Sequence, residues 1–553
     1  MAGPLDSVGG GPRAETMQWG KWLAVLMILV VGAGSAASVR PTKNAQKDSQ
    51  SDAAARSGPA GATVLTRVSV PPSMSYSPFN LDRYLNLPSG FSISVYARIG
   101  GARFMAVAPS GDLLVSQPGA GKVMLVRPNP DGDPSIVEFA TGLRNPHDIV
   151  FHTIGSTTYI YISESTQIDR YIYYSGDTAA HDRQVVVAGL PDAGTPELHG
   201  SYAHALKNIA LDSSDKLYVS IGSSCNVCTS DGVATPVRAA VYQYNADGSG
   251  GRLFARGLRN AEGIRFVPGT SDLWAVVNNR DNIAYPANDG TGQYGQVIQS
   301  FVDNHPPDEF TRVRDGGNSG WPYCNPDPDT PAGLDNMPFD RDFQLNQDGH
   351  VECGSMNRID KGIQAHSAPL GLLFLQDTSL DLAYRNGAVV CLHGSWNRAA
   401  KTGYKVAYFP WDAANQRPGH QTDFITGWLD DASQQAWGRP VAAAVDQQGN
   451  MYVSDDASGT IYKLTGPSDA GPAPVIGAVS VDRKNLLVTG QNFDPGSVVL
   501  VNGADWRTLH DDQNPGTLTA KKAAKQIASG QRVVLQVRNS NGMLSSEFNF
   551  IRP

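Results

Sequence analysis

The residues of this chain that are best suited to chemistry are histidines and arginines next to short apolar segments. His204 stands shortly before the segment Asn208-Ile-Ala-Leu-Asp. An unperturbed imidazole titrates near about pH 6.5, so it suits a general base that removes a proton from a hydroxyl group. The alternative is a loop histidine that only hydrogen-bonds to the backbone.

Two arginines occur in turn-like motifs. Arg259 is followed by Asn260 in Gly-Leu-Arg-Asn, and Arg439 lies in Gly-Arg-Pro. A guanidinium group binds a carboxylate through two parallel hydrogen bonds, so these residues suit a pocket for a polyanion. A guanidinium group also stabilises negative charge that develops on an oxygen atom during a reaction. The alternative for each is a surface ion pair, which contributes little.

A repeat provides the elements that would position these residues. Each copy contains a short apolar strand, a turn with Gly, Ser or Asp, and a strand of the type Leu-Tyr-Val-Ser; the six copies begin at Phe104, His147, Lys207, Gly263, Gly371 and Val441. Alternating apolar and polar residues predict half-buried strands, and radially repeated sheets leave few exposed edges. We therefore predict an all-β fold, a six-bladed β-propeller over residues 81–466. The inserts 284–304 and 324–362 would be loops on one face, where chemistry usually occurs.

A second, smaller domain is expected after the Pro/Gly-rich segment 465–474. Apolar segments follow it at the spacing typical of a β-sandwich. Val488-Thr-Gly-Gln-Asn-Phe493 and Val501-Asn-Gly503 resemble the IPT/TIG module. The resemblance implies an immunoglobulin-like β-sandwich over residues 474–553. We see no catalytic constellation in it, so we expect an accessory role.

Composition limits the class of protein. The chain has 553 residues, with 41% hydrophobic and 17% charged residues, which is typical of a globular protein of more than one domain. The 58 Gly and 36 Pro favour turns and short strands over long helices. The net charge is −8 and Lys and Arg are scattered, so nucleic acid is not an expected partner.

The N-terminal region indicates export. Arg13 and Lys21 precede the apolar run 22–31, and small residues follow it. This pattern is typical of a secretory signal, and the run is short for a membrane span. We expect a signal peptide or signal anchor at 1–38, a linker at 39–80, and a periplasmic or secreted protein. An uncleaved anchor, the only membrane contact we expect, remains the alternative.

Five cysteines are compatible with one or two disulfides in an exported protein. Cys225 and Cys228 lack the further ligands of a zinc site and the βαβ context of a redox motif, so a local disulfide is favoured. Cys324 and Cys353 flank a Pro/Asp-rich loop and are a candidate pair. Cys391 lies in an apolar run and is expected to be a buried free thiol.

Several further motifs follow one another along residues 88–464. They include Gly142-Leu-Arg-Asn-Pro-His-Asp, Gly257-Leu-Arg-Asn, Asn279-Arg-Asp, Gly316-Gly-Asn-Ser-Gly-Trp-Pro and Leu392-His-Gly-Ser-Trp-Asn-Arg. In this order they resemble the soluble quinoprotein glucose/sorbosone dehydrogenases. That family oxidises sugars with pyrroloquinoline quinone (PQQ) and calcium.

The resemblance implies roles for individual residues. His204 would be the base and Arg259 would act at the quinone; cofactor contacts would come from Arg259, Asn260, Arg439, His147 and Asn279. Carbonyl groups of the segment that includes Arg280 and Asp281 would hold calcium, which takes six to eight oxygen ligands. The alternative is that Asp281 only caps a turn. The substrate pocket would be lined by Trp321, His366, His393, Trp396 and Arg398, although packing is the commoner role for any one of them.

The chain also departs from the family pattern. Ala203 replaces an acidic residue before the catalytic histidine, and Ser223 replaces another. The segment His393-Gly-Ser-Trp-Asn-Arg lacks the family's cofactor-binding lysine. These changes move the chain toward the sorbosone and pyranose branch.

The leading hypothesis is therefore oxidation of a sugar or sugar-derived alcohol or aldehyde, with electrons passing through PQQ to a periplasmic acceptor. It requires a well at the hub of the propeller. Two alternatives share the fold: a calcium-dependent lactonase or hydrolase, and a non-catalytic propeller that binds carbohydrate or protein.

Overall fold

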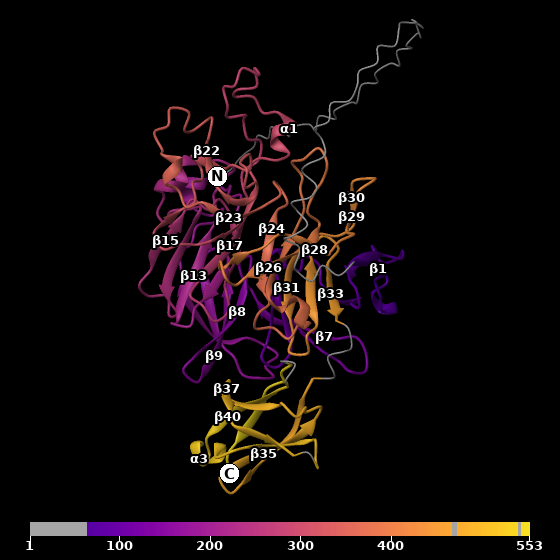
Figure 1. Cartoon of the computed structure of the whole chain (residues 1–553). Coiled ribbons are helices and arrows are strands. Elements are labelled where there is room, and N and C mark those ends of the chain that lie inside the picture. Colours follow the sequence, from indigo (N-terminus) through magenta and orange to yellow (C-terminus); the bar gives the residue numbers. More distant parts are fainter. Residues whose placement is uncertain (1–62, 467–472, 512, 540–542) are drawn as a thin grey trace, which may run out of the picture. The chain divides into compact units, whose positions relative to one another are not determined.

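The computed structural model describes residues 63–466, 473–511, 513–539 and 543–553. The expected leader at 1–38 and residues 39–62 of the expected linker lie outside the described residues. The regular secondary structure of the described chain is almost wholly β-strand (Figure 1), with three short α-helices: α1 (Gln299–Val302), α2 (Leu382–Arg385) and α3 (Ala523–Gln526). None of these is long and apolar enough to cross a membrane.

Within the described residues 92–465, six sheets of four or five strands follow one another. The first sheet contains β4 (Met105–Val107), β5 (Leu113–Gln117), β6 (Lys122–Arg127) and β7 (Ser135–Thr141). The second contains β8 (Ile149–Ile154), β9 (Thr157–Ser163), β10 (Ile168–Ile172) and β11 (His181–Val187). The third contains β12 (Ile209–Leu211), β13 (Lys216–Ile221), β14 (Ala240–Asn245), β15 (Arg252–Arg256) and β19 (Gly317–Asn318).

The fourth sheet contains β16 (Ala261–Phe266), β17 (Leu273–Val277), β18 (Asp308–Arg312), β23 (Ile359–Ile363) and β21 (Asp335–Met337). The fifth contains β24 (Pro369–Phe374), β25 (Gly387–Leu392), β26 (Lys405–Asp412), β27 (Arg417–Pro418) and β28 (Thr422–Ile425). The last contains β3 (Ser92–Arg98), β33 (Thr460–Thr465), β32 (Met451–Asp455) and β31 (Pro440–Val445). Each copy of the sequence repeat coincides with the first two strands of a sheet.

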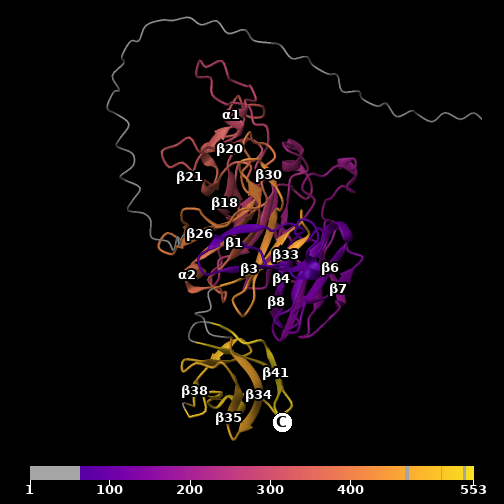
Figure 2. The same cartoon turned by 90° about the vertical axis from the view of Figure 1, so that its right-hand side faces the viewer.

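The first strands of these sheets form a closed ring. β4, β8, β12, β16, β24 and β31 contact one another in that order, and β31 contacts β4. The last sheet combines both ends of this region, because β3 pairs with β33 in a register that places Ile93 opposite Leu464. Figure 2 shows indigo β3 beside orange β33. Sheets arranged radially in this way form a propeller.

Serines of the repeated motif are hydrogen-bonded to four of the six inner strands. Four of these serines accept a hydrogen bond at 2.8–3.2 Å from a backbone N–H at the start of their own inner strand: Ser116, Ser163, Ser220 and Ser454. Ser163 and Ser454 also donate to backbone carbonyls of the next sheet, Lys207 O and Arg103 O, each at 2.6 Å. The recurring serine therefore ties neighbouring sheets together near the hub.

Apolar side chains fill the space between neighbouring sheets. Trp274 of β17 is fully buried and packs edge-on against Phe310, 5.5 Å between ring centroids, and against Trp411 of β26, at 5.3 Å. Such aromatic pairs bury a large area and hold one sheet against the next. The sheets thus form a rigid frame for the loops at the hub.

Two expectations about connecting segments were wrong. The part of the expected linker over 63–67 is strand β1 (Thr63–Arg67), which pairs with β2 (Tyr84–Pro88). The insert 324–362 is not only loop, because β21 and β23 extend the sheet at the edge of β18 and β20 (Cys324–Pro326) pairs with β22 (Phe339–Arg341). In these pairs the strands are joined by a loop longer than a tight turn, as between Arg67 and Tyr84, so no hairpin signal revealed the pairing.

The C-terminal region has its own core. β34 (Val475–Asp482), β35 (Asn485–Gln491), β39 (Thr517–Ala520) and β38 (Thr508–His510) form one sheet, and β37 (Ala504–Trp506), β36 (Val498–Val501), β40 (Arg532–Arg538) and β41 (Phe548–Ile551) form another. Side chains from both sheets share one buried cluster that includes Val488, Leu518, Val499 and Leu535.

Candidate active site

The candidate residues lie where the chain enters or leaves the inner strands. His147 precedes β8, Arg259 and Asn260 precede β16, and Arg439 directly precedes β31. Asn279 follows β17, which is antiparallel to β16, so it lies at the same end of that sheet. Because the inner strands surround one axis, the ends of these strands bring distant residues together.

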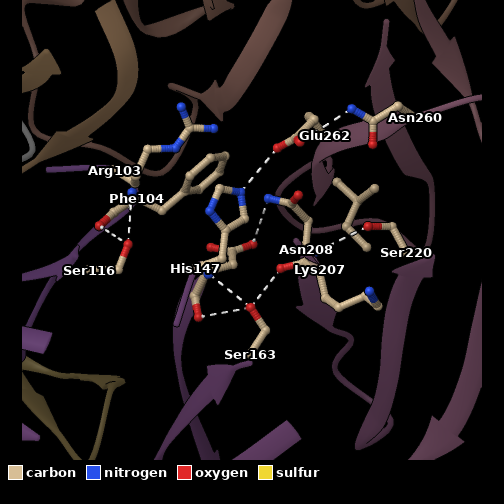
Figure 3. Close-up of polar contacts among 12 residues, drawn as sticks. Arg103, Phe104, Ser116, His147, Ser163, Lys207, Asn208, Ser220, Asn260 and Glu262 are labelled. Carbon is tan, nitrogen blue, oxygen red and sulfur yellow. Dashed lines mark hydrogen bonds and ion pairs between the residues drawn. The ribbon is translucent and has the colours of Figure 1, made fainter. Parts of the chain in front are cut away.

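A buried histidine–carboxylate pair crosses the hub (Figure 3). His147 Nε2 lies 3.0 Å from Glu262 Oε2, and Asn260 Nδ2 donates to Glu262 Oε1 at 3.3 Å. Burial alone would raise the pKa of Glu262, but His147 and the positive charge of Arg103 lower it to about 2. Glu262 is therefore an ionised group beneath the Arg259–Asn260 pair.

The hub is filled beside this pair. The Phe104 ring lies 4.4 Å from the His147 ring, and Phe104 forms an apolar cluster with Leu370, Val441 and Ala442. The expected well is therefore closed at this level, because small and aromatic side chains from three inner strands converge there.

Asn226 joins three predicted site residues. Its carbonyl oxygen accepts from Arg259 Nε at 3.1 Å and from Trp321 Nε1 at 3.3 Å, and its Oδ1 accepts from Arg259 Nη2 at 3.0 Å. Its side chain also exchanges two hydrogen bonds with the backbone of Asp281, at 2.8 and 3.0 Å. Asn226 thereby holds the guanidinium beside the segment predicted to bind calcium.

Arg259 is buried without a close anionic partner. Its nearest carboxylate oxygen, Asp281 Oδ2, is 3.7 Å away, and its hydrogen bonds go to the neutral oxygens of Asn226 and Asn278. Burial lowers its pKa to about 10, so it still carries its positive charge at neutral pH. The charge is therefore available to an anionic ligand.

His204 is held by neutral groups. Its Nδ1 lies 2.9 Å from both the carbonyl oxygen and the hydroxyl oxygen of Ser223. Burial and the nearby charge of Arg259 lower its pKa to about 4, so the imidazole is neutral at neutral pH. Gly222 lies between His204 and Asn260: a Cβ there would meet His204 Cβ and Asn260 Oδ1, each at 2.6 Å. Only glycine permits this approach.

Arg439 belongs to a second polar group. It donates to the carbonyl oxygens of His393 and Gly394, both at 2.9 Å. His393 Nε2 lies 2.8 Å from Asp456, which also pairs with Arg103 at 2.7 Å. The charge of Arg103 also lowers the pKa of Glu262, so this second group lies next to the histidine–carboxylate pair.

The segment Asn279-Arg280-Asp281 is strongly constrained. Asn279 is buried, and its Nδ2 donates to Pro307 O at 2.6 Å and to Glu309 at 3.0 Å. The Arg280 guanidinium is occupied by an ion pair with buried Asp342, so only its carbonyl oxygen is suited to a cation. The carboxylate of Asp281 faces Arg259 and His366 Nδ1, the latter at 3.5 Å.

The predicted pocket residues differ in placement. Trp321 contacts Asn226 as described, and His366 lies beside Asp281, which raises the pKa of His366 although burial opposes the shift. Trp396 is 71% exposed, and Arg398 donates to backbone carbonyls. Asn397 between them is buried and donates to Asp281 at 3.4 Å, so only the middle of this loop reaches the site.

Sequence reasoning missed several residues of this site. Glu262 could have been found, because it lies two residues after Asn260, at the start of β16, and alternate residues of an extended chain point the same way. Asn226 and Arg103 carried no local signal. Asn226 lies between the two cysteines of the Cys225–Cys228 disulfide. The predictions for the cysteines are confirmed: Cys225 is bonded to Cys228, Cys324 is bonded to Cys353, and Cys391 is a buried free thiol.

The ring of sheets matches a known protein family. The TrAA12-like family profile matches residues 85–467, the region that contains these sheets. This chain belongs to the TrAA12-like family. The family is related to PQQ-dependent pyranose dehydrogenases, which agrees with the branch favoured by the departures at Ala203 and Ser223.

Curated relatives of this TrAA12-like chain match only part of it. A pyrroloquinoline quinone-dependent pyranose dehydrogenase of Coprinopsis cinerea is 26% identical over 246 residues, 39% of this chain and 32% of the relative. An uncharacterized protein of Borreliella burgdorferi is 25% identical over 277 residues, 48% of this chain and 62% of the relative. The chain therefore spans less than two thirds of either relative.

Solved structures support the fold. The iodide structure of the Trichoderma reesei carbohydrate-active enzyme of family AA12 covers 69% of this chain and 97% of its own, with a TM-score of 0.54 and 20% identity. The holo form of the PQQ domain of pyranose dehydrogenase from Coprinopsis cinerea gives the same values. At this identity the likeness establishes a shared propeller fold.

Proposed function

We propose that this chain is a PQQ-dependent dehydrogenase that oxidises a sugar or a sugar-derived alcohol or aldehyde. The observation that carries the proposal is the buried Arg259 guanidinium, held by Asn226 and close to the neutral imidazole of His204. The family membership and the pyranose dehydrogenase relative support the same activity.

The donor groups of the site fit PQQ, which carries three carboxylates. Arg259 and Arg439 donate to neutral oxygen atoms, so both charges remain available to a polyanion. When bound, PQQ would accept a hydride from the substrate carbon. Arg259 would bind and orient the cofactor, with Asn260, Arg439 and Asn279 as further contacts. His147, predicted as a contact, is fully buried against Phe104 and Glu262, so it would support the site from within the hub.

His204 would act as the general base. Its Nδ1 is engaged with Ser223, so Nε2 is the nitrogen that takes the proton of the substrate hydroxyl group. Burial and the charge of Arg259 keep the imidazole neutral at neutral pH. Trp321, His366 and Asn397 would shape the substrate pocket beside Asp281.

Calcium would be held by backbone carbonyls of the segment 279–281. A calcium structure of the Trichoderma reesei family AA12 enzyme has a similar fold, and oxygen ligands are those that calcium prefers. Asp342 holds the middle residue of this segment, Arg280, and Asn226 holds its last residue, Asp281. The Arg280 side chain would not be a ligand.

We further propose the wider organisation predicted from the sequence. The six sheets would be six propeller blades, and residues 474–553 would be an immunoglobulin-like accessory domain of the IPT/TIG type. The protein would be exported and would pass electrons to a periplasmic acceptor. The lactonase alternative is less well supported, because the hub carboxylates Glu262 and Asp456 are engaged by His147 and Arg103 and are not free to hold a central calcium ion.

The test is reconstitution of the purified protein with PQQ and calcium, followed by dye reduction across a panel of sugars. We expect reduction that depends on PQQ. His204→Ala should lower turnover by roughly 10²–10⁴ while PQQ still binds, and His350→Ala, at an exposed surface histidine, should change neither. Absence of PQQ binding would refute the proposal; full activity of His204→Ala would refute the base assignment.

A further inference from the structure

A histidine and two carboxylates converge outside the candidate active site. His305 precedes β18, and Asp327 and Asp329 follow β20. One ligand atom from each of the three residues lies within 4.8 Å of the other two. The described residues contain no other group of three or more His, Cys, Asp or Glu side chains with this geometry.

The imidazole of His305 is oriented toward the two carboxylates. Its ring stacks on Phe301, with 3.8 Å between centroids and 9° between planes, and Nδ1 lies 2.9 Å from Phe301 O. A carbonyl oxygen only accepts, so Nδ1 carries the proton and Nε2 carries the lone pair. Histidine ligands of metal ions are held in this way.

The free lone pair is buried. The His305 side chain is only 8% exposed, and Nε2 forms no hydrogen bond with any described residue. A buried polar atom without a hydrogen bond is costly, and a bound cation would satisfy its lone pair. Asp329 Oδ2 is 3.3 Å from Nε2, close enough for one ion to contact both.

The carboxylates are fixed on one short loop. Asp327 Oδ1 accepts from Asp329 N at 2.8 Å, which holds the Asp327 carboxylate against the backbone of Asp329. Asp340 on β22 is close by: burial, Asp327 and Asp329 raise its pKa to about 6, although His305 opposes this. Negative charge is therefore concentrated around the imidazole, and the Asp329 side chain, 74% exposed, leaves room for water ligands.

We propose that His305, Asp327 and Asp329 bind a divalent transition metal ion of the zinc type. Zinc accepts imidazole nitrogen together with carboxylate oxygen, whereas calcium prefers oxygen ligands alone. The ion would join the chain before β18 to the loop after β20. This site uses none of the residues proposed to bind PQQ or calcium, so it stands independently of the proposed function.

The test measures zinc bound by the full-length protein after treatment with a chelator and dialysis against zinc chloride. We expect His305→Gln to bind about one zinc ion per chain less than the wild type, with elemental analysis as the readout. Asp329→Asn changes an exposed side chain, so it should leave folding intact while weakening zinc binding at least about tenfold in calorimetry. Excess calcium should not displace the ion.

The matched control is the exposed pair His350 and Asp348, in which Nδ1 and Oδ1 are 2.6 Å apart. His350→Gln and Asp348→Asn should leave both stoichiometry and affinity unchanged. The proposal is overturned if His305→Gln retains the full zinc content, or if Asp329→Asn binds zinc as tightly as the wild type. Displacement of zinc by calcium would also overturn it, since that indicates an oxygen-ligand site.

Discussion

His204 Nδ1 lies 2.9 Å from both the carbonyl and the hydroxyl oxygen of Ser223. The Ser223 hydroxyl donates its own proton to Cys225 O at 2.8 Å, which leaves it to accept from the imidazole. The proton of the neutral ring is therefore on Nδ1, and Nε2 is free to act as a base. Ser223 stands where the quinoprotein family has an acid; it preserves the orientation of the histidine but supplies no charge.

The first prediction follows from this neutral environment. Burial and Arg259 lower the pKa of His204 to about 4, so in the cofactor-free protein the ring should stay neutral until the pH falls well below the ordinary value of 6.5. An NMR titration of the histidine rings, with His204→Gln to assign the signal, measures this directly. A midpoint near 6.5 would show that the ring is solvated.

The same shift affects stability with a defined sign. Because the folded pKa lies below the unfolded one, the unfolded chain takes up the proton first as the pH falls. The wild type should therefore lose stability between about pH 6.5 and pH 4 relative to His204→Gln, which has no titrating ring. If the unfolding temperatures of the two proteins change by the same amount across this pH range, the lowered pKa of His204 is contradicted.

The second prediction concerns Gly222. An added methyl group would meet His204 Cβ and Asn260 Oδ1 at 2.6 Å, so Gly222→Ala must displace the base, the cofactor contact, or both. A displacement of about 1 Å near the reacting atoms lowers turnover by about 10²-fold. Gly232→Ala is the matched control, because a Cβ there has no neighbour within 4 Å. Steady-state kinetics should separate the two variants, and equal activity would place His204 outside the chemistry.

Much of the frame could be predicted from the sequence, because its determinants are local. The alternation of apolar residues located the first two strands of each sheet, and a strand ending in serine recurs in four of the six copies. The hydrogen bonds of Ser163 and Ser454 now explain why the serine recurs: it satisfies the backbone at the start of its own inner strand and reaches the next sheet. What the motif could not reveal was pairing outside the repeat, such as β1 with β2.

The candidate site was only partly predictable for the same reason. Arg259 and Asn260 lie in a recognisable motif, but Asn226, which orients Arg259, is distant in sequence and has no diagnostic neighbours apart from two cysteines. The filled hub was also missed, because it depends on how Phe104, Leu370 and Val441 converge from three different strands. Contacts across the ring depend on its closure and not on local pattern.

The third prediction tests the anionic pocket. Arg259→Lys keeps the positive charge but loses the planar group that bonds to Asn226 and Asn278, so it cannot present two parallel donors to a carboxylate. We expect PQQ affinity to fall by roughly 10- to 100-fold, the effect of one charged hydrogen bond lost in a buried site. Arg252→Lys, which alters an exposed pair with Asp315, is the control. Fluorescence titration with PQQ measures both, and equal affinities would remove Arg259 from the cofactor site.

The last prediction concerns the serine that joins two sheets. Ser163 is fully buried; it accepts from Asp148 N at 2.8 Å and donates to Lys207 O at 2.6 Å. Ser163→Ala leaves these groups without the hydroxyl, and a buried polar group that loses its partner costs about 1–3 kcal/mol. Denaturant unfolding should show a loss of this size in the free energy of unfolding, whereas Ser249→Ala in an exposed turn should change it by less than about 0.5 kcal/mol. Equal effects of the two substitutions would mean that the recurring serine reflects turn chemistry alone and does not hold neighbouring sheets together.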